Sequence, residues 1–246
     1  MLKRKGDFKK KRGPRPVNTM DVPFIPSPLY DQIRLVDETD DYWVWEKPAG
    51  LLVEKSAIFP SLESYVFKKD RAERKKPFVG VVHRIDRPVS GLVIMAKKKS
   101  ILKMLNERFR DQKINKTYLA LVQPCPPKLE DTIENWISKD AKTKMAHIHK
   151  KKVEGAAQGI LEYSTMQSSE GKCLLEIRPK TGKYHQIRVQ LGNLGCPIVG
   201  DGKYGSKVRP NEEEIYLHAW KIEFWDPASG KLKSYETAVP AFSTNL

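Results

Sequence analysis

Cysteine is scarce in this sequence. The chain has three cysteines in 246 residues, Cys125, Cys173 and Cys196, and none belongs to a C-x-x-C pair. This spacing argues against a disulfide framework and against a zinc ribbon, so we expect free thiols and no metal site. The scarcity fits the reducing environment of the cytoplasm.

Long apolar runs are absent. The first residues, "MLKRKGDF", lack the apolar stretch of a signal peptide. No later run approaches the roughly eighteen apolar residues that a membrane helix needs. We therefore expect a soluble cytoplasmic protein without a membrane partner.

Acidic residues are in the minority. Lysine and arginine total 45 against 30 aspartates and glutamates, and the net charge of +15 favours a polyanionic partner such as nucleic acid. The first sixteen residues, "MLKRKGDFKKKRGPRP", hold eight basic residues and one acid without apolar periodicity. We predict a disordered basic tail over residues 1–20, which either contacts RNA or only adds solubility. Residues 21–246 are long enough for a domain with a sizeable core.

Most of the remaining chain has the alternation of strands. The expected strands are "YWVWEKPAG", "GLVIMA", "KTYLALV" and "YLHAWKIEFW". Helical spacing is confined to "SLESYVFKKDR", "SILKMLNERFRD" with Ser100 as N-cap, and "YHQIRVQLGNLG". Long helices do not alternate with strands as in a doubly wound fold, so we predict an α+β protein with one extended sheet.

Two further patterns suggest sites that the context does not support. The stretch "GDGKYG", residues 200–205, matches G-x-G-x-x-G, but Pro210 obstructs the helix that a dinucleotide site requires, so these glycines are expected in turns. His147 and His149 could share one face of a strand, but no third metal ligand is near in the sequence. We interpret them as ordinary strand histidines.

The stretch "VVHRIDRPVSGLVIMAKKK" places the carboxylate of Asp86 between Arg84 and Arg87. A surface ion pair is the simplest interpretation of a lone acid beside arginine. A carboxylate that acts as a nucleophile must stay ionised where water is excluded, and a nearby guanidinium favours its charged form. Pro88 and Gly91 set this acid on a turn ahead of a strand. On the predicted helix, Arg188 points about a quarter-turn from the apolar stripe and can face a cleft.

Five blocks together resemble the motifs of the RluA-type RNA pseudouridine synthases. In chain order they are "YWVWEKPAGLLV", "HRIDRPVSGLVIMAKK", "KINKTYLALV", "TGKYHQIRVQLGNLGCPIVGDGKYG" and "LHAWKIEFWDP". The resemblance extends from Asp41 to Pro240. It implies the pseudouridine synthase fold, with a mixed, mostly antiparallel sheet, flanking helices and an active-site cleft.

The resemblance also implies an isomerase without a cofactor, which detaches uracil from ribose in RNA, rotates it and rejoins it through carbon. The family's nucleophile falls on Asp86. The tyrosine that stacks on the target base, and that takes part in proton removal, falls on Tyr118, although a core aromatic is an alternative for this position. The arginine that pairs with the nucleophile falls on Arg188.

Several basic and polar residues are expected to contact RNA. By the resemblance, Arg84 enters the helix stack when the target uridine is extruded, and Arg87 serves phosphates. The other expected RNA contacts, each with a solvated surface residue as the alternative, are His83, Lys116, Lys183, His185 and Gln186. Tyr184 and Gln190 stand where family members commonly have threonine and histidine.

We predict a monomeric RNA pseudouridine synthase that acts on ribosomal or transfer RNA, with no small-molecule cofactor. Many relatives carry an S4-type RNA-binding domain, and the roughly twenty-five residues between the basic tail and "YWVWEKPAG" are too few for one. One alternative is a catalytically silent RNA-binding or ribosome-assembly protein on the same fold. A hydrolase that uses Asp86 with His83 as its base is a weaker alternative, because residues this close on a tight turn rarely converge on one substrate.

Overall fold

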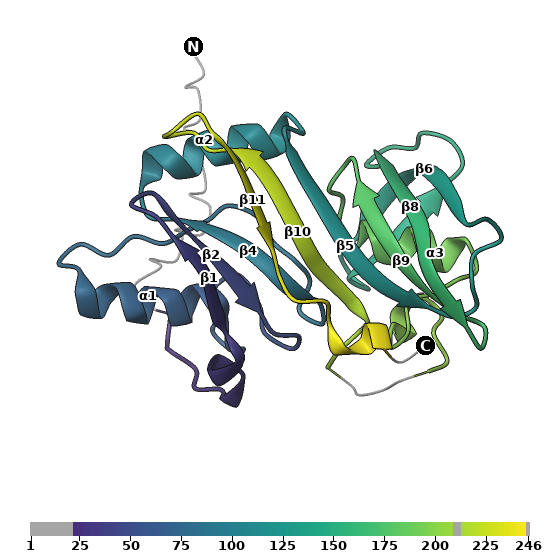
Figure 1. Cartoon of the computed structure of the whole chain (residues 1–246), viewed down its shortest axis with the longest axis horizontal. Coiled ribbons are helices and arrows are strands. Elements are labelled where there is room, and N and C mark those ends of the chain that lie inside the picture. The colour runs from purple at the N-terminus through teal and green to yellow at the C-terminus, as the bar shows by residue number, and fades with distance from the viewer. Residues whose placement is uncertain (1–21, 209–212, 245–246) are drawn as a thin grey trace, which may run out of the picture.

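The computed structural model describes residues 22–208 and 213–244 of the chain, so the predicted basic tail lies outside the described residues. Within them an eleven-stranded sheet runs through the whole molecule, with three α-helices on its flanks (Figure 1). The strands are β1 Arg34–Glu38, β2 Tyr42–Lys47, β3 Gly80–Val81, β4 Ser90–Ala96, β5 Ile114–Val122, β6 Glu130–Asp140, β7 Met145–His149, β8 Ala157–Ser169, β9 Lys172–Pro179, β10 Leu217–Trp225 and β11 Leu232–Glu236. The helices are α1 Leu62–Glu73, α2 Lys99–Arg110 and α3 Gln186–Asn193, with 3-10 turns η2 Pro28–Gln32, η3 Gly202–Tyr204 and η4 Ala241–Thr244.

The sheet has the order β1-β2-β4-β10-β5-β9-β8-β6-β7, with β11 added to β10 and β3 to β4. Every named strand pair in the described residues is antiparallel except β4 with β10. Gly91 allows this parallel contact, since its φ is +115° and a Cβ there would lie 2.3 Å from the carbonyl oxygen of Ala219. The predicted α+β fold with a mixed, mostly antiparallel sheet is confirmed.

The three predicted helices are present, although one begins differently. Ser61 caps α1, with its side chain accepting a hydrogen bond from Ser64 N. The prediction that Ser100 caps α2 is wrong, because the helix begins at Lys99 and its N-cap is Lys98. In Figure 1, α1 and α2 flank the β1-β2-β4 end of the sheet, and α3 lies near β6, β8 and β9.

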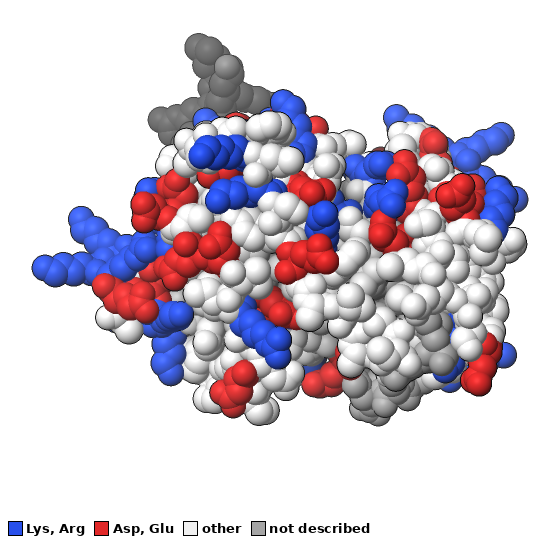
Figure 2. All heavy atoms as spheres, viewed as in Figure 1, with Lys and Arg blue, Asp and Glu red and all other residues white. Residues whose placement is uncertain are grey.

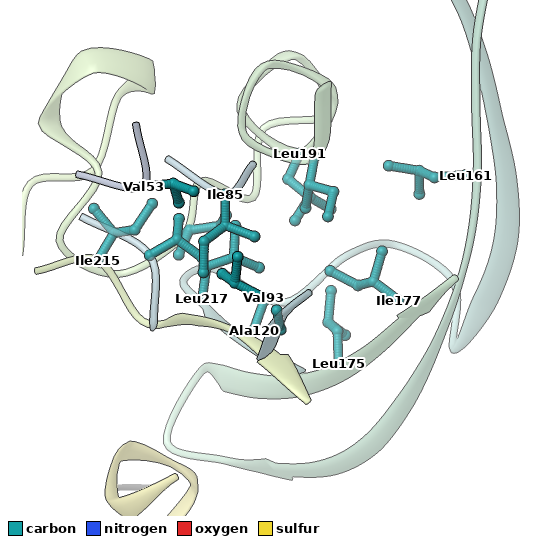
Figure 3. Packing of buried hydrophobic residues seen from close by; sticks show 14 of the residues in the cluster. Val53, Ile85, Val93, Ala120, Leu161, Leu175, Ile177, Leu191, Ile215 and Leu217 are labelled. Atoms are coloured by element: carbon teal, nitrogen blue, oxygen red, sulfur yellow. The ribbon is translucent and has the colours of Figure 1, made fainter. Parts of the chain in front are cut away.

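The largest core cluster joins the two ends of the sheet. It packs side chains of β2, β4, β5, β8, β9 and β10 against α1 and α3 and against the segments that follow β2, precede β4 and follow α3 (Figure 3). Leu191 of α3 and Ile85, the residue before Asp86, both point into this cluster. Burial of a large aliphatic side chain contributes about 1.5–3 kcal/mol. The Asp86 turn and the Arg188 helix are therefore anchored in the same core.

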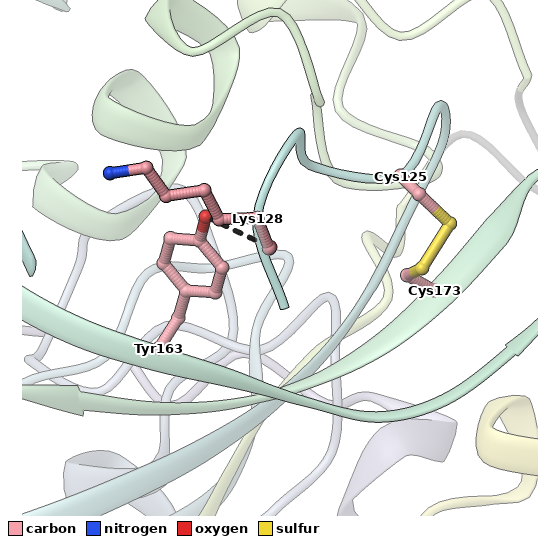
Figure 4. Close-up of a disulfide and its surroundings, with 4 residues drawn as sticks. All are labelled: Cys125, Lys128, Tyr163 and Cys173. Atoms are coloured by element: carbon pink, nitrogen blue, oxygen red, sulfur yellow. Dashed lines mark hydrogen bonds between the residues drawn. A yellow bond between two sulfur atoms is a disulfide. The ribbon is translucent and has the colours of Figure 1, made fainter. Parts of the chain in front are cut away.

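The expectation that the cysteines are free is wrong for two of them. Cys125 and Cys173 form a disulfide with sulfur atoms 2.10 Å apart, and Cys196 is a buried free thiol (Figure 4). The bridge forms because Val122, at the end of β5, pairs directly with Cys173 in β9. The loop that follows β5 therefore starts beside Cys173, although the two cysteines are 48 residues apart in sequence. The cysteine argument for a reducing compartment no longer holds.

The surface carries both signs of charge. On the face shown in Figure 2, acidic and basic side chains are interspersed, so this face offers no uniformly basic surface to RNA. No helix in residues 22–208 or 213–244 is long and apolar enough to cross a membrane. The same residues hold no group of three or more side chains suited to a metal ion.

Candidate active site

Asp86 lies on a turn between β3 and β4. Its side chain and that of the preceding residue, Ile85, point in opposite directions. Ile85 is 8% exposed and enters the core, whereas the Asp86 side chain is 27% exposed. Val89 N donates to the carbonyl oxygen of Asp86 at 3.1 Å and closes the turn just before β4. A cavity of about 460 Å³ nearby, lined by residues such as Pro48 and Ser90, does not include Asp86. The carboxylate thus faces the surface from a rigid turn.

A buried lysine donates a hydrogen bond to the backbone of this turn from the core side. Lys47, at the end of β2, is fully buried, and its Nζ donates to the carbonyl oxygens of Pro48 at 2.7 Å, Leu51 at 2.8 Å and Arg87 at 3.4 Å. Burial lowers the pKa of Lys47 to about 7, against the opposing effect of the Asp86 charge. Three carbonyl acceptors match the three N–H groups of an ammonium ion. Lys47 therefore ties the end of β2 to the Asp86 turn.

Arg188 of α3 is held between two carboxylates. Its Nη1 donates to Oδ2 of Asp86 at 2.9 Å. Its Nε and Nη2 donate to the two carboxylate oxygens of Asp201, at 2.7 and 2.9 Å. Burial alone would lower the pKa of Arg188, but the hydrogen bonds and charges of Asp201 and Asp86 raise it. The bidentate pair with Asp201 fixes the guanidinium plane and aims its remaining nitrogen at Asp86.

Tyr118 comes from the middle of the sheet, where β5 pairs with both β10 and β9. Burial raises the pKa of the Tyr118 phenol, and the nearby Asp86 charge raises it further. The phenol is thus protonated at neutral pH in the free protein. Its ring therefore offers a flat apolar surface near the carboxylate.

His185 begins α3 with a left-handed backbone, φ 52°. Its imidazole Nε2 lies 3.6 Å from Oδ2 of Asp86, and its Nδ1 lies 2.7 Å from the hydroxyl of Tyr204 in η3. Burial lowers the pKa of His185 to about 4, although the Asp86 charge acts in the opposite direction. The imidazole is therefore neutral near pH 7, and its contact with Asp86 is not an ion pair.

Three basic side chains predicted to contact RNA come from β5, from the segment that holds Asp86 and from the loop before α3. Arg84 is exposed and its Nη1 donates to Oε2 of Glu54 at 2.7 Å. Lys116 has no hydrogen bond or ion pair within residues 22–208 and 213–244, and burial lowers its pKa. Its Nζ lies 3.6 Å from the position of a Cβ at Gly182, in the loop that also holds the half-buried Lys183. Lys116 thus lies beside the loop that precedes α3, and Arg84 pairs with Glu54.

Comparison with known proteins identifies the family. A family model described as RNA pseudouridylate synthase matches residues 41–193, more than half of the chain. The chain belongs to the RNA pseudouridine synthases. These are isomerases, and the resemblance described from the sequence motifs is confirmed.

Two relatives are similar over most of the chain. The ribosomal large subunit pseudouridine synthase C of Buchnera aphidicola is 37% identical over 201 residues, which cover 78% of this chain and 62% of that protein. The chain therefore spans less than two thirds of that relative's length. An uncharacterized RNA pseudouridine synthase of Haemophilus influenzae is 33% identical, over 78% of this chain and 82% of that protein.

A solved human structure, RNA pseudouridylate synthase domain containing 1, has the same fold. It superposes with a TM-score of 0.72 and covers 88% of this chain and 87% of its own, at 19% sequence identity. At this identity the likeness concerns the fold alone.

The structure brings some of the predicted site residues together. Arg188 contacts Asp86, and the charge of Asp86 reaches Tyr118 and His185. Arg84 is exposed and Lys183 is half-buried. Their roles in synthase chemistry stay predictions.

Three other predicted RNA contacts are engaged by the protein itself. His83 accepts a hydrogen bond from Ile94 N at 3.1 Å, stacks on Phe109, and has its pKa lowered to about 3 by burial, so it is no base for Asp86. Arg87 donates to Gly50 O at 2.8 Å and pairs with Glu213. We therefore do not propose His83 as an RNA contact, whereas the phosphate contact of Arg87, whose ion pair is exposed like that of Arg84, stays a prediction.

Gln186 is also engaged by the protein. It is 4% exposed, accepts from Thr181 Oγ1 and Lys183 N, and donates to Ile160 O. It shapes the loop before α3 and is not proposed as an RNA contact. Gln190, fully buried, likewise donates to backbone carbonyls of β6 and β8 and faces the core.

The sequence analysis missed three residues of this site, Lys47, Asp201 and Tyr204. Asp201 and Tyr204 belong to "GDGKYG", which was interpreted only as turns. The turns are present, with φ of 90° at Gly200 and 101° at Gly205. The available signal was an acid inside a tight turn, 13 residues after Arg188. For Lys47 it was a charged residue directly following an apolar strand.

Proposed function

We propose that this protein converts a uridine of large-subunit ribosomal RNA to pseudouridine, with Asp86 as the nucleophile. The observation that carries the proposal is the carboxylate of Asp86, partly exposed on a rigid turn and bonded to the buried Arg188. A guanidinium beside the carboxylate favours its ionised form, which a nucleophile needs. We also propose that the protein acts as a monomer.

The proposed reaction is an internal rearrangement without net oxidation or reduction, so its balance requires no second reactant. Asp86 attacks C1′ of the ribose, and the bond from C1′ to N1 of uracil breaks. The uracil rotates, its C5 bonds to C1′, and the bond to Asp86 breaks. The proton on C5 then leaves, while N1 of the product gains one. The atoms of substrate and product are therefore equal in number.

The surrounding residues receive roles that fit this sequence of steps. Tyr118 stacks against the extruded base. Its phenol is protonated in the free protein, which favours a stacking role over a role in proton removal. Arg84 fills the space that the base leaves. Lys116 and Lys183 bind phosphates beside the cleft.

Ribosomal RNA is favoured over transfer RNA by the relatives. The Buchnera protein is a ribosomal large subunit pseudouridine synthase C, and a relative 32% identical in Borreliella burgdorferi is a ribosomal large subunit pseudouridine synthase D. Because the ribosomal relatives are bacterial, we also propose a cytoplasmic location. Mapping of pseudouridine in total RNA from cells with and without the protein would identify the site, and loss of a site in transfer RNA alone would overturn this assignment.

The catalytic proposal is tested with Asp86→Asn. Release of tritium from C5 of labelled uridine in large-subunit RNA should be abolished in this variant, because the nucleophile is lost at nearly constant shape. RNA affinity should be retained. Asp131→Asn, a matched change at a β6 residue paired with Lys128, should leave the rate unchanged. Wild-type turnover by Asp86→Asn would refute the role, and an inactive wild-type protein that still binds RNA would favour a silent RNA-binding protein.

A further inference from the structure

The hydroxyl of Tyr204 has a defined hydrogen-bond direction. The backbone N–H of Ala146, in β7, donates to this oxygen at 2.8 Å. The same oxygen lies 2.7 Å from Nδ1 of His185. If His185 carried its proton on Nδ1, the phenolic proton of Tyr204 would have no acceptor in the part of the chain that the structure describes. The satisfied arrangement is the one in which Tyr204 donates to Nδ1.

This arrangement determines what His185 presents to Asp86. A neutral imidazole with an unprotonated Nδ1 carries its proton on Nε2. The Nε2–H then faces Oδ2 of Asp86 from 3.6 Å. In the other tautomer a lone pair would face the carboxylate, and the two would repel. The ring cannot easily turn away, since it stacks on Tyr184 at 3.9 Å and meets the edge of Tyr204.

The structure assigns Tyr204 as a positioning residue, which fixes His185 in the tautomer whose Nε2–H faces Asp86. This inference rests on the proposed function, in which Asp86 is the nucleophile. Arg188 and His185 then both direct N–H groups at Oδ2. Oδ1 has no hydrogen-bond partner among the described residues. Oδ1 is therefore the oxygen left to attack the ribose.

Asp201 precedes the single turn η3 and Tyr204 ends it, so one short segment orients both donors. Asp201 aligns Arg188 and Tyr204 aligns His185. The Arg188 guanidinium also lies over the Tyr204 ring, 5.2 Å from its centroid. A change that keeps this ring and removes only its hydroxyl separates the tautomer effect from the packing.

The test is Tyr204→Phe, with Tyr184→Phe as the matched control. The Tyr184 hydroxyl also binds the chain near the start of β7, through the carbonyl of Lys144, but it does not touch an imidazole nitrogen. We expect Tyr204→Phe to slow single-turnover isomerisation about tenfold, the equivalent of one lost hydrogen bond, with RNA affinity retained. Tyr184→Phe should leave the rate unchanged.

A second readout does not depend on activity. The nitrogen-15 spectrum of labelled protein should show His185 with a protonated Nε2 and a hydrogen-bonded, unprotonated Nδ1. The His185 signals are identified by their loss in His185→Gln. In Tyr204→Phe the Nδ1 signal should move toward that of a mixture of tautomers, whereas Tyr184→Phe should leave it in place.

His185→Gln provides a rescue, because a glutamine amide can place an N–H near the position of Nε2. We expect this variant to be more active than His185→Ala, and Tyr204→Phe to have little further effect on it. A protonated Nδ1 in the wild type, or a wild-type rate in Tyr204→Phe, would overturn the inference. If the wild-type protein forms no pseudouridine in any RNA, the proposed function fails, and the spectrum still decides the tautomer.

Discussion

Asp86 and Asp201 contact the same guanidinium and differ chiefly in their access to solvent. Asp201 is 1% exposed and takes two of the three bonding nitrogens of Arg188, whereas Asp86 is 27% exposed and takes one. The buried acid is the counter-ion that keeps a buried arginine in place. The exposed acid receives the remaining N–H and keeps one oxygen for a substrate. Chemically equal side chains thus differ in burial and in their bonds to Arg188, and in the proposed function only the exposed one is reactive.

The largest effect expected from this contrast is on folding. Asp201→Asn removes the charge opposite a buried guanidinium, and breaking a buried pair costs about 3–5 kcal/mol. Asp86→Asn keeps an oxygen acceptor for Arg188 and should change the free energy of unfolding by less than about 1 kcal/mol. Urea denaturation of both variants measures the difference. The contrast is broken if the two substitutions destabilise the protein equally.

Lowering the pH should reduce the free energy of unfolding through a second buried ionisable group, a histidine near the Asp86 turn. His218 of β10 is 3% exposed, and its ring nitrogens lie 2.8 Å from Ser90 Oγ and 2.7 Å from Thr237 Oγ1. Burial lowers the pKa of His218 to about 4. The unfolded chain therefore binds more protons between pH 6.5 and 4, so stability present above pH 6.5 is lost as the pH falls through this window. The loss from His218 amounts to at most about 3 kcal/mol.

The measurement is the free energy of unfolding at pH 7 and pH 4.5 in the wild type and in two variants. His218→Gln should reduce the pH dependence, because the titrating ring is gone. His147→Gln, at a half-exposed position in β7, should preserve it. The assignment to His218 is wrong if both substitutions have the same effect on the slope. His83 and His185, whose pKa values are also lowered, keep a residual pH dependence in every variant.

The contrast between Asp86 and Asp201 also shows which features could be predicted from the sequence. The continuous apolar run "GLVIMA" and the strand-like stretch "KTYLALV" predicted β4 and β5, because the pattern of a strand is local. Asp86 was recognised as a carboxylate on a turn ahead of an apolar strand, and Arg188 as a charge outside the apolar stripe of a helix. The family motifs assigned the two residues to one site.

Contacts that depend on strand register or on a returning turn could not be predicted. Asp201 looked like a turn residue, since nothing local shows that η3 returns to α3. The Cys125–Cys173 bridge depends on the pairing of Val122 with Cys173, which no spacing in the chain records. Burial likewise turned Gln186 from an expected RNA contact into a loop support.

The smallest effect on stability is expected at Arg84, because this arginine is exposed whereas Arg188 is buried. The Arg84 side chain is 65% exposed and pairs with Glu54, itself 53% exposed, so Arg84→Ala should change the free energy of unfolding by less than about 0.5 kcal/mol. Single-turnover isomerisation should slow more than RNA binding weakens, because the proposed role begins when the base leaves the stack. Glu54→Gln, which removes the ion pair and keeps the arginine, is the matched control and should retain the wild-type rate. RNA affinity measured at several salt concentrations separates the two possible roles. A phosphate contact would flatten the slope of log K against log salt by roughly 0.7 to 0.9 on its loss, and a defect of that kind without a slower turnover would make Arg84 one phosphate contact among others.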